Sequence, residues 1–229
     1  MKKLGMVILV LAVAGLGAGT KPEQAGPGWK DHFSVDKSRL QSSGRNPYFI
    51  LEPGYTLYLA DGAETLTVTV LQAIEVVDGV TTRVVEERET ENGQLGEISR
   101  NFFAIDPATS DVYYFGEEVE IYKDGRVVSH EGAWRAGVNG AKFGLMVPGA
   151  PKIGDRFYQE IAPGVAMDRA EVASLEEALE TPAGQFRGCL RIKETSALEA
   201  GSSVKIFAPG VGLIKDDAFV LTKVEQRRI

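Results

Sequence analysis

Residues 204–215 read Val-Lys-Ile-Phe-Ala-Pro-Gly-Val-Gly-Leu-Ile-Lys, two short apolar runs separated by a Pro-Gly-Val-Gly corner. Proline fixes one backbone torsion and glycine permits positive φ, so the chain can reverse tightly at this corner. The tetrapeptide Ala-Pro-Gly-Val also occurs at residues 162–165, directly after the strand-like run 157–161. Short apolar runs joined by tight corners predict an all-β protein across residues 47–225.

Three Asx-Gly pairs, Asp78-Gly79, Asn92-Gly93 and Asp124-Gly125, separate long β-rich runs. Such pairs are the strongest short-range signal for β-hairpins. In the run before the first pair, Leu66 and Val68 alternate with threonines, which is the period of a strand with one buried face. Residues 174–179 have some helical propensity, but their place in this series favours strand. The predicted fold is an antiparallel meander of about ten strands curled into a half-barrel or barrel, with little helix.

The two ends of the chain differ from this meander. Lys2 and Lys3 precede an apolar run at residues 4–16 and small residues at 17–19, which predicts a signal peptide over residues 1–19. An uncleaved anchor is the alternative. Residues 20–46 are rich in Gly, Pro, Ser, Lys and Gln and are expected to form a flexible tether. Residues 47–229 then form a single β domain, periplasmic or extracellular, with no transmembrane segment in the mature chain.

Charge and cysteine content narrow the classes of function. The chain carries 25 basic and 32 acidic side chains, a net charge of −7, which argues against nucleic acid and anionic membrane surfaces as partners. Cys189 is the single cysteine, so no intramolecular disulfide can form. The stability of an exported chain of this kind must therefore come from its core.

The stretch 135–155 carries five glycines and two prolines and is expected to be a long loop. Loops of this length are usually functional or disordered, and this one also contains large apolar side chains. The composition is that of a lid over the open end of a curled sheet; the alternative is a cluster that closes the core and never opens. The candidate ligand-binding residues are Trp134, Phe143, Leu145, Met146 and Tyr158.

Cys189 is a second candidate. Strict alternation would place it on the strand face shared by Arg187 and Arg191, where two guanidinium groups would lower the pKa of the thiol. A reactive thiol is one interpretation. An inert, buried packing residue is the other, and it is the usual state of a free cysteine.

Carboxylates cluster in two runs, and they bind a hard cation only if the runs meet on adjacent strands. The alternative is a solvated or edge-guarding strand face, on which Glu89 is expected to lie. His32 and His130 are too far apart to give a metal-binding spacing. No phosphate loop, nucleophile elbow or Cys-x-x-Cys motif is present, so no catalytic residue, cofactor or metal is predicted. The two runs are Glu86, Glu87, Glu89 and Glu91, and Glu117, Glu118 and Glu120.

Taken in order, Asn-Pro-Tyr-Phe at residues 46–49 with Pro53-Gly54, Tyr-Phe-Gly-Glu at 114–117, Pro-Ala-Gly at 182–184 and the closing stretch 207–215 resemble an uncharacterised family of exported bacterial, mostly-β proteins. The resemblance implies export and assigns no catalytic residues. At the level of the fold, the meander also resembles the curved sheets of periplasmic lipoprotein carriers, which hold a lipid in their concave face.

These observations favour an exported, non-enzymatic binding module. Its concave sheet face would hold a lipid-like or other apolar small molecule, or an envelope protein. A carboxylate- or thiol-dependent enzyme and a structural envelope-interaction protein remain the alternatives. A contiguous apolar cavity would favour the first class, whereas converging carboxylates or an exposed Cys189 in a cleft would favour an enzyme.

Overall fold

The computed structural model describes residues 28–227, which fold into an antiparallel sheet nearly closed into a barrel. The predicted signal peptide at 1–19 lies outside the described residues. The one short helix is the 3-10 turn η1 (Lys37–Arg39), and no helix among residues 28–227 is long and apolar enough to cross a membrane. The first strands are β1 (Gly44–Asn46), β2 (Phe49–Leu51), β3 (Tyr55–Asp61), β4 (Glu64–Val77), β5 (Val80–Glu91), β6 (Gln94–Ile105), β7 (Val112–Lys123), β8 (Arg126–Ser129) and β9 (Trp134–Arg135). They are followed by β10 (Lys142–Val147), β11 (Arg156–Tyr158), β12 (Glu160–Ile161), β13 (Asp168–Thr181), β14 (Gly184–Ser196), β15 (Ser203–Ala208), β16 (Gly212–Asp216) and β17 (Phe219–Gln226).

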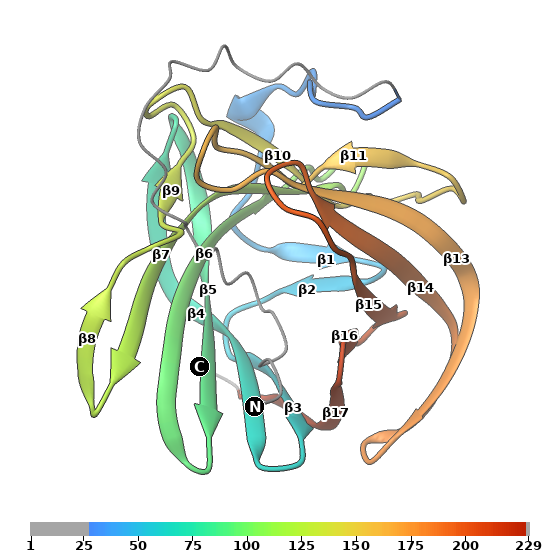
Figure 1. Ribbon diagram of the computed structural model, residues 1–229. Helices are drawn as coiled ribbons and strands as arrows, with labels where there is room; N and C mark the ends of the chain where they lie inside the picture. The colour runs from blue at the N-terminus through green and yellow to red at the C-terminus, as the bar shows by residue number, and fades with distance from the viewer. Residues whose placement is uncertain (1–27, 228–229) are drawn as a thin grey trace.

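The predicted meander is confirmed, as two runs of antiparallel hairpins. Strands β3 to β7 form the first run and β13 to β17 the second, and β17 pairs with β3 to join them. Both residues of each Asx-Gly pair have positive φ, from 50° at Asp78 to 78° at Gly79, as the expected hairpin turn requires. Residues 174–179 lie within β13, as favoured. Figure 1 shows the two runs as curved walls facing each other.

The remaining gap, between β7 and β13, is closed by a single kinked stretch of chain. Its first half, β11, pairs with β13, and its second half, β12, pairs with β10, which in turn pairs with β7. Gln159 separates the two halves, and its N–H donates to the carbonyl of Asp168 at 2.9 Å. The sheet therefore closes because one segment changes partner at Gln159.

Residues 28–46 require a correction to the predicted tether. Phe33 is 6% exposed and contacts the rings of Tyr113 and Phe143, while Gln41 pairs with Ile105 through two backbone hydrogen bonds. The large apolar side chains of a polar-looking segment thus pack onto the sheet. Packing of this kind recovers about 1.5–3 kcal/mol for each fully buried large side chain and offsets the ordering of the segment.

The expected loop at 135–155 is also corrected, because its centre is strand β10. Two of its glycines are required because another stretch of backbone lies against them, and not because the segment must move. A Cβ at Gly144 would lie 2.3 Å from the carbonyl oxygen of Gln159, and one at Gly149 would lie 1.9 Å from that of Thr109. Only the short connections 136–141 and 148–155 lie outside regular structure. The composition resembled a loop because glycine is also required where strands crowd together.

The barrel interior is apolar over much of its length. Leu59 and Leu66 are at most 1% exposed and Phe207 is 2% exposed. The β1–β2 hairpin lies across the interior, since β1 contacts β6 and β2 contacts β16 (Figure 1). The corner at 209–212 holds this hairpin in place: Gly210, at φ 73°, donates its N–H to the carbonyl of Pro47 at 2.7 Å. The interior is thereby filled by the chain itself.

Candidate functional site

Strands β5, β6 and β7, here called the β5–β7 wall, carry carboxylates on both faces. Because side chains alternate along a strand, Glu86 points outward while Glu87 lines the interior. Arg100 lies directly opposite Glu86 and reaches its carboxylate at 3.2 Å, and it also reaches Glu120 at 3.4 Å. Arg135 pairs with Glu118 in the same way. The outer carboxylates are therefore matched by arginines.

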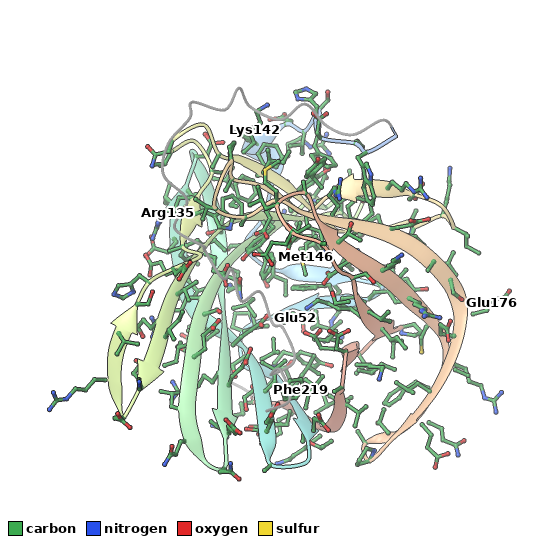
Figure 2. The ribbon with its side chains drawn as sticks, viewed as in Figure 1. Glu52, Arg135, Lys142, Met146, Glu176 and Phe219 are labelled. Carbon is green, nitrogen blue, oxygen red and sulfur yellow. The ribbon has the colours of Figure 1, made fainter. Side chains whose placement is uncertain are left out.

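The inner carboxylates surround a cavity that we call the acidic chamber. It has a volume of about 50 Å³, enough for a few water molecules. Its basic group is Lys205, whose ammonium lies 2.7 Å from Asp216 and 3.7 Å from Glu194. Side chains from β5, β6, β7, β10, β12, β13, β14 and β15 line it: Glu87, Asn101, Phe103, Tyr114, Glu117, Met146, Gln159, Glu160, Asp168, Glu194 and Lys205. Figure 2 shows Met146 between the two walls.

Burial raises the pKa values of these carboxyl groups. The pKa of Glu117 is raised to about 8, first by burial and then by the charge of Glu87. Burial likewise raises the pKa of Glu87 to about 7. At Glu89, burial and then the charge of Glu97 raise the pKa to about 8, so this residue is not on the solvated face expected from the sequence. Burial and the charge of Asp168 raise the pKa of Glu160 well above its usual range.

Several buried polar atoms in this region make no hydrogen bond. Both carboxyl oxygens of Glu160 lack a partner although the residue is 1% exposed, and Oε2 of Glu117 lacks one at 4% exposure. The indole N–H of Trp134 lies near Glu160 and favours its charged form, but no hydrogen bond of ordinary geometry joins them. A buried group without a partner costs about 1–3 kcal/mol, so these atoms mark a place where binding would be favourable.

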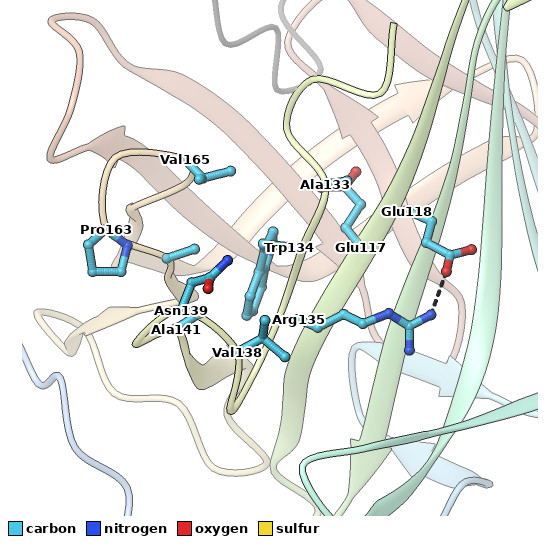
Figure 3. A pocket seen from close by; sticks show the side chains of 11 residues that line it. Glu117, Glu118, Ala133, Trp134, Arg135, Val138, Asn139, Ala141, Pro163 and Val165 are labelled. Atoms are coloured by element: carbon cyan, nitrogen blue, oxygen red, sulfur yellow. Dashed lines mark hydrogen bonds and ion pairs between the residues drawn. The ribbon is translucent and has the colours of Figure 1, made fainter.

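A larger cavity, here called the Trp134 pocket, adjoins the chamber at Glu117, which lines both. It has a volume of about 290 Å³ and is partly open to solvent. Figure 3 shows the Trp134 ring between the turn at Pro163 and Val165 and the ion pair of Arg135 with Glu118. Its lining is Glu117, Glu118, Ala133, Trp134, Arg135, Val138, Asn139, Ala141, Ala162, Pro163 and Val165.

The predicted ligand-binding residues separate into two groups. Trp134 lines the pocket named after it, and Met146 lines the acidic chamber. Phe143 instead stacks on Phe115 at 4.9 Å between ring centroids, and Leu145 is buried in the same core. Tyr158 belongs to a small separate cluster, with Ile161 and Met167 among its members. These three side chains line none of the cavities described here.

Cys189 is fully buried, and burial raises the pKa of its thiol, opposite to what a reactive thiol needs. The predicted alternation fails because Gly188 adopts φ 64° and the pairing of β13 with β14 slips near it. Cys189 and Leu190 consequently both lie in the core, while Arg187 and Arg191 remain exposed. The packing interpretation of this cysteine agrees with the structure.

Metal binding finds no support in the described part of the chain. Within residues 28–227, no three His, Cys, Asp or Glu side chains converge closely enough to hold a metal ion. His130 has a local role, because its Nδ1 lies 2.6 Å from the carbonyl oxygen of Val119. The inner carboxyl groups are thus close enough to repel one another without forming a coordination shell.

Most residues of the acidic chamber were not predicted from the sequence. The carboxylate runs pointed to Glu87 and Glu117, but Glu160, Asp168 and Glu194 come from strands distant along the chain. The sequence of β15 contained one weak indication of a buried charge. Lys205 lies two residues before Phe207, so both side chains are on the same face of the strand, and this face lines the interior. Only the pairing of the two walls brings these groups together.

No family model and no curated protein matches this chain. A solved structure from Parabacteroides distasonis, described as a "putative lipoprotein", is 10% identical over 80% of this chain and 100% of its own, with a TM-score of 0.37. A second, from Bacteroides fragilis, described as a "putative exported protein with YmcC-like fold", is 15% identical over 80% of this chain and 100% of its own, with a TM-score of 0.39. Similarity at this level assigns no function.

Proposed function

We propose that this protein is an exported, non-enzymatic binding module that holds a small, largely apolar molecule in the Trp134 pocket. The observation that carries the proposal is the pocket itself, about 290 Å³ with a lining of mostly apolar side chains. Ligand sites are typically concave and apolar, from about 300 Å³ upward, with a few polar groups that orient the ligand. Glu117 and the indole N–H of Trp134 are such groups, and neither is fully hydrogen-bonded within the protein. Export rests on the predicted signal peptide.

The size of the cavities limits the ligand. The apolar interior of the barrel is filled by its own side chains and leaves cavities of about 50 Å³. A lipid on the concave face would therefore have to displace core residues such as Phe207, at a cost of several kcal/mol. The Trp134 pocket needs no such displacement. A compact molecule of one ring or a short branched chain fits this description better than a long acyl chain.

The enzymatic alternatives are less well supported. A thiol-dependent mechanism requires an accessible thiolate, and Cys189 is fully buried. A carboxylate-dependent mechanism needs two carboxyl groups around the substrate. Glu160 lines only the chamber, which has room for water but not for a substrate, and Glu118, the second carboxylate of the Trp134 pocket, is paired with Arg135. A binding role requires only the Trp134 pocket, which is partly open to solvent and is lined in part by Glu117.

The proposal is tested by fluorescence of Trp134. Trp29→Phe leaves Trp134 as the single tryptophan, and this background is titrated with toluene and other one-ring apolar molecules. A saturable change is expected, because Trp134 lines the pocket. Val165→Phe, which narrows the pocket, should weaken binding at least about tenfold. Val128→Phe, the same change at an exposed position on β8, is the matched control and should have no effect. If no molecule gives a saturable change, the pocket is not a ligand site.

A further inference from the structure

Glu117 stands in the wall shared by the Trp134 pocket and the acidic chamber. Its Oε2 makes no hydrogen bond of ordinary geometry although the residue is 4% exposed. The hydroxyls of Ser99 and Tyr114 lie near and lower its pKa, but they donate to Glu97 and Asn101 instead. A ligand that places a donor against this oxygen would recover the free energy that the unpaired acceptor costs. A charged donor would recover more, because charge-assisted hydrogen bonds are roughly twice as strong as neutral ones.

The groups around Glu117 favour a positive charge in the ligand. Behind it lie the carboxyl groups of Glu87, Glu97 and Glu160, whose charges act on one another through a low-dielectric interior. Lys205 does not neutralise Glu117 or Glu160, since its ion pairs are with Asp216 and Glu194. Above about pH 8, where Glu87 and Glu117 are mostly ionised, the chamber is therefore an unbalanced source of negative potential at the inner end of the pocket.

Arg135, the basic side chain in the wall of the Trp134 pocket, does not disfavour a cationic ligand. The guanidinium of Arg135 turns away from Trp134 toward Glu118, as Figure 3 shows. It also lies 3.6 Å from Glu75 and covers the ring of Phe102 at 4.6 Å. With two carboxylate partners and an aromatic one, Arg135 does not serve as the partner of Glu117. The cation site at Glu117 is thus left for a ligand.

Trp134 supplies a second element of cation recognition. Its ring lies in the pocket, held edge-to-face against Tyr114 with 5.2 Å between ring centroids. Tryptophan is the best aromatic partner for a cation over its face. A carboxylate and an indole at one end of an apolar pocket are together the chemistry that recognises an alkylammonium group. A metal ion fits less well, because the described residues provide no coordinating group of three side chains.

We propose that the Trp134 pocket selects molecules that carry an organic cation, an ammonium or a guanidinium group on a small apolar body, with Glu117 as its ion-pair partner and Trp134 covering it. This inference rests on the proposed function and names the class of ligand that the pocket takes. Glu160 makes no direct contact in this arrangement and lies behind Glu117 in the chamber.

The experiment compares three probes with the same phenethyl body: phenethylamine, phenethyl alcohol and hydrocinnamate. Binding is measured at pH 9, where Glu117 is mostly ionised, by Trp134 fluorescence in the Trp29→Phe background and confirmed by calorimetry. Phenethylamine should bind at least about tenfold more tightly than phenethyl alcohol, and hydrocinnamate should bind more weakly than both, because its carboxylate meets Glu117.

Two variants locate the selectivity. Glu117→Gln keeps the shape of the side chain and should reduce the affinity for phenethylamine to that for phenethyl alcohol, with the alcohol unchanged. Glu160→Gln should lower the preference for the amine only a few-fold. Glu176→Gln makes the same change at an exposed position on β13, on the outside of the wall in Figure 2, and should alter neither affinity.

The outcomes separate this inference from the proposed function. If the alcohol binds as tightly as the amine, or if Glu117→Gln preserves the preference, cation selection is wrong while the binding pocket stands. If none of the three probes nor any apolar molecule binds the unmodified pocket, both proposals fall. A preference for the amine that Glu117→Gln abolishes and Glu176→Gln leaves intact supports the inference.

Discussion

On the outer face of the β5–β7 wall, Glu86 and Glu120 flank Arg100, whereas on the inner face Glu87 and Glu117 meet mostly other carboxyl groups. Glu86 and Glu87 are of the same type and stand one position apart on β5. The outer pairs are partly exposed to solvent, where such a pair contributes at most about 1 kcal/mol. The inner groups lie in a low dielectric, where an unpaired charge costs several kcal/mol. The difference shows that the inner face is not organised for maximal stability, which is typical of a binding site.

The largest test of this contrast removes the basic residue Lys205, which reaches the interior from β15, and the basic residue Arg100 on the outer face of the wall. Lys205→Met leaves Asp216, whose side chain is 3% exposed, without its cation and should lower the free energy of unfolding at pH 8 by about 3–5 kcal/mol. Arg100→Met on the outer face should cost less than about 1 kcal/mol. Urea denaturation of both variants measures the two losses. Equal losses would mean that the inner face is as well solvated as the outer one.

The second test is the dependence of stability on pH. Glu87, Glu89 and Glu117 have folded-state pKa values of about 7, 8 and 8, above the ordinary value of 4.5. Between pH 4.5 and 8 the folded protein therefore binds more protons than the unfolded chain, and stability falls as the pH rises through this window. Charged groups facing these three are Glu97, Glu160, Asp168, Glu194, Lys205 and Asp216.

The free energy of unfolding should be larger at pH 5 than at pH 8.5, by an amount on the order of a few kcal/mol. Below this window stability should fall again, because exposed pairs such as Arg45 on β1 with Glu52, where the hydrogen bond from Arg45 lowers the pKa of the carboxyl, weaken in stronger acid. Urea denaturation across pH 4.5–9 tests this, and Glu117→Gln should flatten the profile. Stability that rises with pH over the whole range would contradict the burial of these carboxyl groups.

The smallest test compares neighbouring carboxylates on β5. Glu89→Gln removes an inward charge that other carboxyl groups disfavour and should raise the free energy of unfolding at pH 8.5, by less than about 1 kcal/mol because Glu89 is only half-buried. Glu86→Gln removes the outward partner of Arg100 and should lower it by a similar amount. Differential scanning calorimetry resolves the signs. The same sign for both would show that the two faces do not differ.

The sequence determined the local structure of this protein. Asx-Gly pairs adopt positive φ at low cost, so the hairpins at Asp78, Asn92 and Asp124 form where they were predicted. Alternation at Leu66 and Val68 correctly predicted strands, and the Pro-Gly corner at 209–212 turns as expected. All of these depend on residues close together in the chain, which is why a single sequence was enough to predict them.

Only the tertiary structure decided which residues meet across the barrel. Gly144 looked like a loop residue because its sequence does not reveal the Gln159 carbonyl that crowds it. A one-residue slip at Gly188 moved Cys189 into the core, since a strand exchanges its faces whenever its register shifts by one. Glu117 and Glu160 are brought to one cavity by strands that pair only when the sheet closes. Closure joins segments far apart along the chain, so the electrostatics of the site belong to the fold and cannot be derived from local pattern.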